Sequence, residues 1–151
     1  MITVRPYLPE DRAAVLALTP RLAEGVATWR DPGAVGTAVL GWVTGSLERT
    51  GNDDHGTFVA VHDGHVAGFV TVTTRTHFTG ARDAYVGELV VSPEAERTGV
   101  GSTLMSAAES WARAHGLHRV TLETGAANLP ARAFYRSLGF TEEDVRLSKP
   151  I

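Results

Sequence analysis

The chain has 151 residues, enough for one domain with a sizeable core, and its 43% hydrophobic and 21% charged residues are ordinary for a globular protein. Its 14 basic and 17 acidic residues give a net charge of −3, which argues against a nucleic-acid-binding domain because such domains carry a basic patch. The lack of cysteine excludes disulfides, thiolate zinc sites and a cysteine nucleophile. No apolar run has the length of a signal peptide or a membrane span, so we expect a cytoplasmic protein that binds neither nucleic acid nor membrane.

The N-terminal part of the chain predicts a short strand followed by two helices. Residues 2–5 are typical of a strand, and Pro9 opens a helix that Pro20 is expected to break or kink. Asp31 followed by Pro32 is a strong signal for the start of a second helix. The apolar positions of this second helix are Val35, Val39, Trp42, Val43 and Leu47.

A hairpin and then a buried strand are expected next. Residues 57–74 are rich in β-forming side chains on both sides of Asp63-Gly64, which is a strong two-residue turn signal. Residues 84–91 are nearly continuous in apolar residues, which indicates a central strand covered on both faces. Gly87 interrupts this strand, and a glycine inside a buried strand often marks a bulge or the close approach of another chain.

The C-terminal half predicts two further helices separated by a strand. The first begins after Gly99 and Gly101 and ends at Gly116, and its apolar stripe consists of Val100, Leu104, Met105, Ala108, Trp111 and Ala112. Residues 118–124 follow as a strand. The second helix is capped by Asn128 and ends at Gly139.

The order of elements indicates an α/β domain with a mixed sheet. The hairpin supplies antiparallel pairing, and the helical crossover from Val91 to Val120 supplies parallel pairing. Residues 140–141 and 144–149 are short strand candidates at the end of the chain. No linker or repeat divides the sequence, so we expect a single domain over residues 1–151.

Gly99 and Gly101 lie where the buried strand meets the start of a helix, a place that Ser, Thr, Asp or Asn would cap better. Free backbone N–H groups and the positive end of the helix dipole face outward there, and without Cβ atoms a bulky anion can approach them. The segment lacks the third glycine of a Rossmann loop and the Gly-Lys-Ser/Thr of a P-loop. From the turn alone, an anion site and a glycine-eased turn without a ligand are equally good interpretations.

A second motif decides between these interpretations. The first segment is Glu96-Arg97-Thr98-Gly99-Val100-Gly101, and the second combines Asn128, Ala131, Phe134, Tyr135, Gly139 and Phe140. Together they resemble the GNAT family of N-acetyltransferases, whose signatures are Gln/Arg-x-x-Gly-x-Gly/Ala and Asn-x-x-Ala-x-x-Phe-Tyr-x-x-x-Gly-Phe. The second match is complete, and the first departs at Glu96, where the family usually has Gln or Arg.

The resemblance implies a fold and a co-substrate. The expected GNAT fold is a mixed, mostly antiparallel sheet of about six to seven strands, flanked by four helices and splayed at the fourth strand. The co-substrate is acetyl-CoA, and no metal takes part. The N–H near Val90 is expected to face the thioester oxygen. The residues expected to bind acetyl-CoA are Arg97, Thr98, Gly99, Val100, Gly101 and Ser102 for the pyrophosphate, Leu89, Val90 and Val91 for the pantetheine arm, and Asn128, Ala131 and Tyr135.

The implied reaction requires two proton transfers, because a primary amine must lose a proton before it attacks and the departing thiolate benefits from gaining one. By resemblance Tyr135 is the general acid, although its helical spacing from Phe134 and Leu138 alone favours a core residue. Glu88 is the only carboxylate in its otherwise apolar strand and is a candidate general base. A structural role for Glu88, paired with an arginine or at the solvated end of the sheet, is an equally good interpretation.

Other side chains carry weaker signals. His115 and His118 lie on either side of Gly116 and cannot share a helix face, so no metal site is expected. The aromatic side chains that are candidates for the acceptor pocket, or simply for the core, are Trp29, Trp42, His77, Phe78 and Tyr85.

The favoured interpretation is direct acetyl transfer, in a ternary complex, to a small or amino-acid-like primary amine. Residues 20–50 and 140–145, which the resemblance places around the acceptor, combine apolar side chains with few carboxylates, as small-molecule pockets do. The alternatives are acetylation of a protein N-terminus or lysine and a non-catalytic acyl-CoA-binding module, and the presence of Tyr135 argues against the module. A nucleotide hydrolase would need a lysine and acidic metal ligands that the motifs lack. A homodimer is left open.

Overall fold

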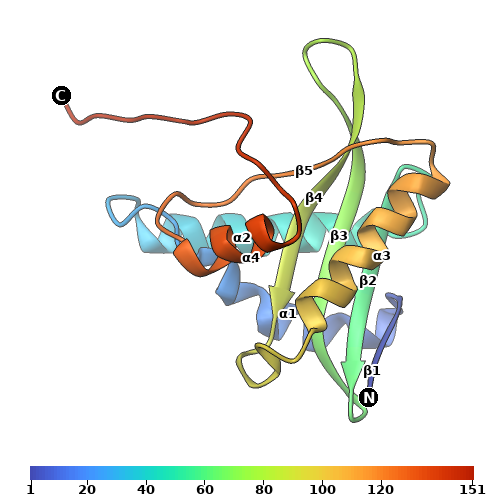
Figure 1. Cartoon of the computed structure of the whole chain (residues 1–151). Helices are drawn as coiled ribbons and strands as arrows, with labels where there is room; N and C mark the ends of the chain where they lie inside the picture. The colour runs from blue at the N-terminus through green and yellow to red at the C-terminus, as the bar shows by residue number, and fades with distance from the viewer.

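The computed structural model describes all 151 residues and contains one sheet of five strands (Figure 1). The strands lie in the order of the sequence, and each pairs antiparallel with the next except β4 and β5, which are parallel. They are β1 (Ile2–Pro6), β2 (His55–His62), β3 (His65–Thr76), β4 (Arg82–Val91) and β5 (Val120–Leu122). The predicted mixed sheet is thereby confirmed.

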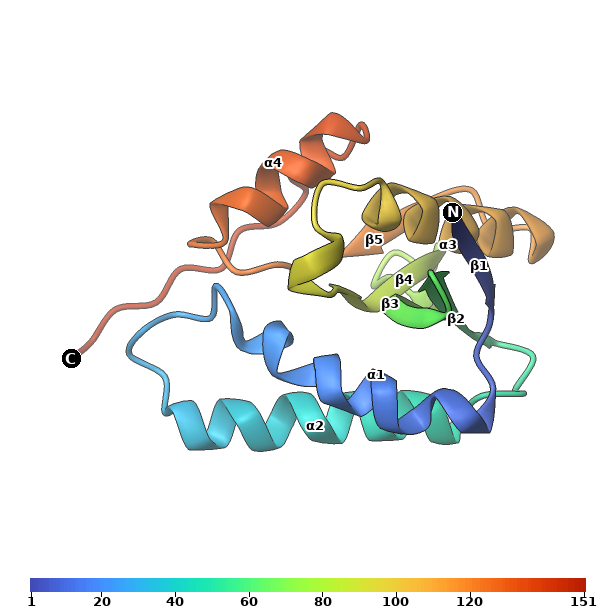
Figure 2. The same ribbon diagram turned by 90° about the horizontal axis from the view of Figure 1, so that it is seen from below.

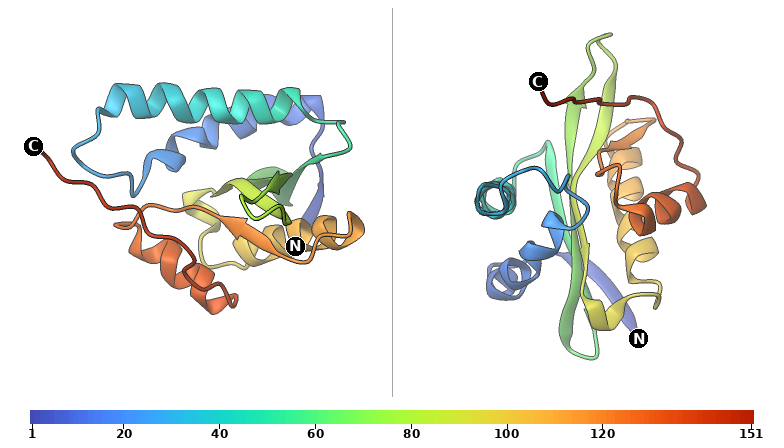
Figure 3. Two further views of the ribbon diagram at one scale, coloured as in Figure 1. Left: turned by 90° about the horizontal axis from the view of Figure 1, so that it is seen from above. Right: turned by 90° about the vertical axis from the view of Figure 1, so that its left-hand side faces the viewer.

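Helices cover both faces of this sheet, as the edge-on views show (Figures 2 and 3). Two helices lie on each face: α1 (Arg12–Leu18) and α2 (Pro32–Glu48) on one, α3 (Val100–Ala114) and α4 (Leu129–Ser137) on the other. Three short 3-10 turns complete the elements: η1 (Pro9–Asp11), η2 (Thr19–Ala23) and η3 (Pro93–Ala95). None of the helices combines the length with the apolar composition that crossing a membrane requires.

The sheet divides the core into two clusters of buried apolar side chains. The larger lies under α3 and contains the whole predicted stripe of that helix, which is confirmed as its buried face. The smaller lies under α1 and α2 and includes the fully buried Val15, Val43 and Phe69. On the same face as this smaller cluster lie the buried polar side chains described below.

Local sequence signals set several of the element boundaries. The first helix changes to 3-10 geometry one residue before Pro20, whose ring cannot continue an α-helix. Asp31 caps α2 by accepting a hydrogen bond from Ala34 N at 2.8 Å. Asp63 and Gly64 form the turn between β2 and β3 with φ of 50° and 80°, and positive φ at both positions is the signature of a type I′ hairpin turn.

One side chain of α2 lies elsewhere than predicted. Trp42 is 56% exposed and does not join the apolar face of its helix. Ser46 is buried instead, three residues after Val43 and seven after Val39, which is the spacing of one helix face. A serine is stable there because it meets a polar group of the sheet rather than an apolar one.

The end of the chain forms no strand. Residues 140–141 and 144–149 are predicted as short strands, but neither segment pairs with the sheet. Phe140 packs against the larger apolar cluster, and the end of the chain then extends away from the domain (Figure 1). The sheet therefore has five strands rather than about six to seven. The edge strand β5 has only three residues, so it offers few backbone groups to which a further strand could bind.

A bulge in β4 decides which of its side chains face which helices. The register with β3 shifts at Gly87, because Thr71 pairs with Glu88 whereas Val72 pairs with Val86. Side chains of a strand alternate between the two faces, so one extra residue reverses the alternation beyond it. Val86 consequently packs under α3, whereas Glu88 faces α2. The bulge that Gly87 predicted is confirmed.

Candidate active site

The carboxylate of Glu88 lies buried between β3 and α2. Glu88 is only 5% exposed. Ser46 Oγ donates to its two carboxylate oxygens at 3.2 and 3.0 Å, and Thr71 Oγ1 donates to Oε2. Thr71 Oγ1 also accepts the backbone N–H of Glu88 at 3.0 Å. The carboxylate therefore has two hydroxyl partners, and it neither forms a salt bridge nor lies at a solvated end of the sheet.

Burial raises the pKa of Glu88 above its ordinary value. The hydroxyl groups of Thr71 and Ser46 and the positive charge of Arg49 oppose the shift without cancelling it. A general base is most effective when its pKa lies near the operating pH, so the shift moves this carboxyl toward the useful range. The raised pKa suits a proton acceptor, and the role of Glu88 in proton transfer stays a prediction.

The segment between η3 and α3 presents a row of backbone N–H groups. Arg97 and Gly99 both have φ in the left-handed region, at 61° and 91°, and α3 begins without a side-chain cap. Among residues 97–102 only the N–H of Thr98 donates within the chain, to the Ala95 carbonyl at 3.4 Å. The remaining donors lie at the positive end of the α3 dipole, and this combination is typical of anion sites.

The two sequence motifs meet in space. The Phe134 ring of α4 packs against the first turn of α3, where a Cβ on Gly101 would stand 3.1 Å from the ring. Any side chain at Gly101 would have to move that ring, so packing as well as ligand access explains the glycine. Asn128 caps α4 as predicted, by accepting the Ala131 N–H at 3.3 Å.

Two glycines bring the loop before α2 against the loop before α4. A Cβ on Gly25 would stand 2.3 Å from Asn128 Cβ, and one on Gly125 would stand 2.0 Å from the Gly25 carbonyl oxygen. Asn128 Nδ2 also donates to Glu24 O at 3.4 Å. The contact ties the segment expected to form the acceptor side, residues 20–50, directly to Asn128.

The one departure from the GNAT motif has a partner of opposite charge. Glu96 forms a salt bridge with Arg21 of η2, which also contacts Glu24 at 3.5 Å. Because the guanidinium neutralises this carboxylate, Glu96 does not present an unpaired negative charge beside the N–H groups of residues 97–102.

Tyr135 is held by aromatic packing, and its hydroxyl is not engaged by the chain. Its ring centre lies 5.3 Å from that of Phe134 and 5.7 Å from that of Phe140. The hydroxyl makes no hydrogen bond within the protein, yet it is not a buried unpaired group, so it keeps contact with solvent. Burial raises the pKa of Tyr135 to about 12. The phenol therefore stays protonated at neutral pH, which a proton donor requires.

Beyond the bulge, β4 and β5 diverge and leave backbone groups facing the opened side. β5 pairs only with residues 84–86 of β4. On the other side of β4, the N–H of Ser92 donates to the Ala67 carbonyl of β3 at 2.8 Å. Every second N–H group along an antiparallel strand points to the same neighbouring strand. The N–H of Val90 thus points to β3, whereas those of Leu89 and Val91 point to the opened side. On this geometry the oxyanion donor expected near Val90 is Leu89 or Val91.

Of the aromatic side chains considered for the acceptor pocket, only His77 and Phe78 contact each other, with ring centres 4.1 Å apart. Trp29, Trp42 and Phe78 are 70%, 56% and 92% exposed. Tyr85 packs under Arg75, whose guanidinium carbon lies 4.2 Å from the ring centre. None of the five lines either of the two pockets described for this fold.

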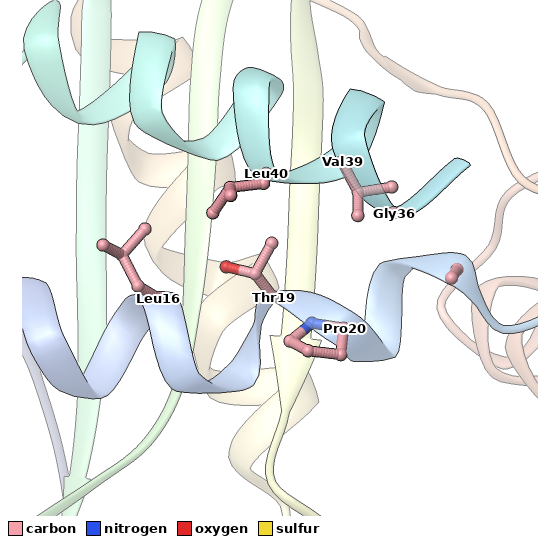
Figure 4. Close-up of a pocket in the computed structure, with 7 residues that line it drawn as sticks. Leu16, Thr19, Pro20, Gly36, Val39 and Leu40 are labelled. Carbon is pink, nitrogen blue, oxygen red and sulfur yellow. The ribbon is translucent and has the colours of Figure 1, made fainter. Parts of the chain in front are cut away.

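An apolar hollow of about 230 Å³ lies between the segment from α1 to η2 and α2 (Figure 4). Five of its seven lining residues belong to residues 20–50, the stretch expected to form the acceptor side. The hydroxyl of Thr19 is its one side-chain polar group, and it donates to Val15 O at 3.3 Å. Because its lining carries no charge, the hollow suits the apolar part of a ligand and not an ammonium group. It is lined by Leu16, Thr19, Pro20, Ala23, Gly36, Val39 and Leu40.

No three acidic or histidine side chains gather as a metal site would require. His115 is engaged by the backbone, because its ring nitrogens lie 2.8 Å from Trp111 O and 2.9 Å from Asp53 O. The ring also stacks on Trp111 at 3.9 Å. His115 therefore fixes the loop before β2 to the end of α3.

Comparison with known proteins assigns the chain to a family. The sequence profile of the acetyltransferase (GNAT) family matches residues 25–140, which is most of the chain. The chain belongs to the acetyltransferase (GNAT) family. The match spans both GNAT motifs, from the N–H groups at the start of α3 to the helix that carries Tyr135.

Known relatives of this GNAT chain act on different molecules. The mycothiol acetyltransferase of Pseudarthrobacter chlorophenolicus is 33% identical over 149 residues, which are 95% of this chain and 44% of that protein. The aminoglycoside N(6')-acetyltransferase type 1 of Klebsiella aerogenes is 34% identical over 86 residues, which are 53% of this chain and 55% of that protein. The chain spans about half the length of these relatives.

A solved structure confirms the GNAT fold. The PaiA N-acetyltransferase of Thermoplasma acidophilum, in complex with coenzyme A, has a TM-score of 0.79 to this chain at 19% identity. The match covers 97% of this chain and 93% of that one. At this identity the likeness concerns the fold alone.

Proposed function

We propose that this protein transfers the acetyl group of acetyl-CoA to a primary amine by direct attack in a ternary complex. One observation carries the proposal. Three features follow one another along β4 and the turn after it: a buried carboxylate, backbone N–H groups that point to the side not covered by β5, and a set of free N–H groups suited to an anion. The carboxylate is that of Glu88. The outward groups belong to Leu89 and Val91, and the anion site is formed by residues 97–102.

The groups present fit acetyl-CoA. The free amides of residues 97–102 match a pyrophosphate. The outward backbone groups of Leu89 and Val91 match the amides of a pantetheine arm lying beside β4 like an added strand. The structural neighbour that holds coenzyme A supports this assignment, in which Asn128, Ala131 and Tyr135 complete the binding site.

Acetyl-CoA supplies an activated thioester, and the chain supplies the groups that move protons and stabilise charge. Glu88 takes a proton from the ammonium form of the acceptor. The N–H of Leu89 or Val91 donates to the thioester oxygen as negative charge develops there. Tyr135, which a pKa of about 12 keeps protonated, gives its proton to the sulfur as the C–S bond breaks, and the second proton lost by the amine nitrogen restores the phenol.

We infer that the acceptor is a small molecule rather than a protein. The relatives are named for mycothiol and for aminoglycosides, both of which are small molecules. The apolar hollow beside α2 can hold an apolar part of such an acceptor. Glu142, in the turn expected on the acceptor side, is already engaged by Arg132 and Arg136, which reduces the acidic surface available to a lysine-rich protein.

The release of CoA from acetyl-CoA tests both the activity and the acceptor class. It is measured with equal concentrations of small amines, aminoglycosides among them, and of peptides that carry N-terminal or lysine amines. We expect small amines to react faster than the peptides. Peptides that react much faster than every small amine would contradict the acceptor class. Binding of acetyl-CoA without release in the presence of any amine would favour the non-catalytic module.

The anion site predicts opposite outcomes for aspartate at the two ends of α3. Gly99 and Gly116 both have left-handed φ, at 91° and 70°, with open space where a Cβ would stand, and aspartate tolerates this conformation. Gly99→Asp places a negative charge beside the pyrophosphate, so we expect it to weaken acetyl-CoA binding by more than about tenfold. The matched control Gly116→Asp, at the far end of the helix, is expected to leave the affinity unchanged. Isothermal titration measures both.

Loss of folding cannot imitate this result. A negative charge is favourable at a helix N-terminus and unfavourable at a C-terminus, by about 0.3–1 kcal/mol. The variant that binds poorly, Gly99→Asp, is therefore expected to be the more stable of the two in thermal unfolding. Equal acetyl-CoA affinity in the two variants would contradict the pyrophosphate site.

Removing Arg21, the partner of Glu96, tests whether this ion pair keeps the negative charge of Glu96 from weakening acetyl-CoA binding. Arg21→Ala leaves the Glu96 carboxylate unpaired, so we expect acetyl-CoA affinity to fall by a few fold, within the roughly 1 kcal/mol that exposed ion pairs contribute. Adding Glu96→Gln to Arg21→Ala removes the free charge and is expected to restore the affinity. The loss should also shrink at high salt, and a loss that neither salt nor Glu96→Gln reduces would contradict the electrostatic explanation.

A further inference from the structure

Residues 21–25 leave the layer of α1 and α2 and reach the loops that follow β4 and β5 (Figure 2). They comprise the end of η2 and the first two residues of the loop before α2. The segment is held in a turn, because Glu24 N donates to Arg21 O at 3.1 Å. Its two ends contact different partners, one in the chain after β4 and one in the chain after β5.

The first anchor of this segment is Arg21. Its guanidinium forms a salt bridge with Glu96, which directly precedes the free N–H groups of residues 97–102. The same guanidinium contacts Glu24 at 3.5 Å, so it is held from both sides. The 3-10 turn η2, to which Arg21 belongs, also contacts β4. This end of the segment therefore lies where β4 leads into the anion site.

The second anchor is a contact between two stretches of backbone. A Cβ on Gly125 would stand 2.0 Å from the Gly25 carbonyl oxygen and 2.8 Å from its carbonyl carbon. These are backbone atoms, which cannot turn away as the end of a flexible side chain does. Asn128 Nδ2 adds a hydrogen bond to Glu24 O at 3.4 Å. This end of the segment therefore packs directly on the loop that follows β5.

The two anchors follow two strands that part from each other. β4 ends five residues before Glu96, and β5 ends three residues before Gly125. Because β4 and β5 are parallel, their carboxyl ends lie at the same edge of the sheet. A slot that admits one added strand is about 10 Å wide, twice the strand spacing, and four residue steps reach at most about 14 Å. Residues 21–25 are therefore long enough to cross the slot.

The segment crosses on the face of the sheet where Glu88 lies. The Glu88 carboxylate points toward α2, whereas α3, whose start carries the anion site, covers the other face (Figure 3). On the proposed function the pyrophosphate is held on the α3 side and the base acts on the α2 side. The reacting atoms then meet where the slot opens toward α2, and residues 21–25 lie at that opening.

We propose that residues 21–25 form a strap that closes this opening and positions the acceptor amine against the thioester. The inference rests on the proposed function, which it extends to the residues that place the acceptor. Arg21, Gly25 and Gly125 are positioning residues, because they act through the place of the strap and not on the reacting atoms. Small displacements of the strap are expected to be costly, since productive attack requires the reacting atoms to lie about 3–3.5 Å apart.

Gly125→Ala displaces one anchor without straining its own backbone. Gly125 does not have left-handed φ, so alanine suits its conformation. The added Cβ requires the Gly25 carbonyl to retreat by more than about 1 Å to reach an ordinary contact distance. We expect kcat/KM for the best amine to fall by at least about tenfold, with the affinity for acetyl-CoA unchanged.

Gly41→Ala is the matched control for this substitution. Gly41 also lacks left-handed φ, and nothing lies within 4 Å of the place of its Cβ. It belongs to α2, where alanine is favoured over glycine. Gly41→Ala is therefore expected to keep the wild-type kinetics for the amine and the wild-type affinity for acetyl-CoA.

Amide hydrogen exchange of the ligand-free protein, measured by mass spectrometry, reports on the strap directly. Exchange becomes faster where a segment loses the contacts that hold it. We expect residues 19–31 to exchange faster in Gly125→Ala than in wild type and in Gly41→Ala. The rest of the chain is expected to exchange as in wild type, which serves as the folding control. This readout needs neither acetyl-CoA nor an amine, so it is independent of the proposed function.

The first anchor is tested by a double variant that separates the strap from the charge of Glu96. Arg21→Ala with Glu96→Gln lacks the salt bridge and leaves no unpaired charge beside the anion site, so acetyl-CoA affinity is expected to be near wild type. The strap has still lost its anchor. At saturating acetyl-CoA, kcat/KM for the amine is therefore expected to stay lowered by a few fold, the scale of one exposed ion pair. Recovery of the amine kinetics together with the acetyl-CoA affinity would contradict the strap.

The outcomes distinguish failure of the strap from failure of the proposed function. Wild-type kcat/KM for the amine in Gly125→Ala, or wild-type exchange of residues 19–31 in that variant, would overturn the strap and leave the proposed function in place. A wild-type protein that transfers acetyl to no amine overturns the proposed function and the positioning role with it. If Gly125→Ala does not fold, the double variant of Arg21 and Glu96 decides.

Discussion

Replacement of Tyr135 by phenylalanine is expected to lower turnover by about 10²–10⁴-fold, the range for loss of a positioned acid. The reason is that the departing sulfur loses its proton donor, while the ring that positions the hydroxyl remains. Because the hydroxyl makes no hydrogen bond within the chain, the fold loses nothing with it. The contacts of the ring with Phe134 and Phe140 are available to phenylalanine as well. Steady-state turnover and acetyl-CoA affinity are the two measurements.

Acetyl-CoA affinity should change little in Tyr135→Phe, so the loss should fall on turnover alone. Tyr7 provides a matched control, since it is a buried tyrosine of the α1 and α2 cluster on the other face of the sheet. Tyr7→Phe is expected to leave turnover unchanged. If Tyr135→Phe turns over at the wild-type rate, Tyr135 is a core residue and the chain lacks the proposed acid.

Glu88→Gln is expected to lower turnover by about 10²–10⁴-fold near neutral pH, because the amide cannot accept the proton of the ammonium group. The loss should shrink as pH rises. A primary amine with a pKa near 10.4 gains free base by about tenfold per pH unit below that value, so the variant recovers in proportion. Glu109→Gln, on α3, is a control with an expected rate equal to wild type. A turnover–pH profile identical in Glu88→Gln and wild type would refute the base.

The same substitution has a predicted effect on stability with a definite sign. The pKa of Glu88 is raised in the folded state, so the folded protein binds more protons than the unfolded chain at pH values above about 4.5. Wild-type stability therefore falls as pH rises through the raised pKa, and glutamine does not share this loss. The free energy of unfolding of Glu88→Gln relative to wild type is expected to increase from acidic to neutral pH. Urea unfolding at both pH values measures it, and a difference that decreases would contradict the buried carboxylate.

Features encoded in adjacent residues were predictable from the sequence. The Asp63-Gly64 turn, the Asp31 cap and the buried stripe of α3 follow from backbone preferences and helical spacing. Gly99 signals the left-handed start of α3 for the same reason. Gly87 likewise predicts a bulge in a buried strand.

Features that depend on partners far apart in the sequence were not predictable. Ser46 contacts Glu88 across 42 residues, and a serine among apolar helix positions gives no signal of its partner. His55 likewise directly follows the exposed residues 50–54 and yet is only 6% exposed. The spacing of α2 suggested that Trp42 is buried, but spacing alone does not say which of two adjacent faces meets the sheet.

The direct test of the central claim is to follow the acetyl group itself. Excess protein is mixed with acetyl-CoA labelled in the acetyl group, with and without the preferred amine, and the label on protein, amine and CoA is measured by mass spectrometry after quenching. Direct transfer predicts that the label stays on CoA without the amine and moves to the amine nitrogen when the amine is present. Label on the protein without the amine, or free labelled acetate in place of acetylated amine, would contradict it.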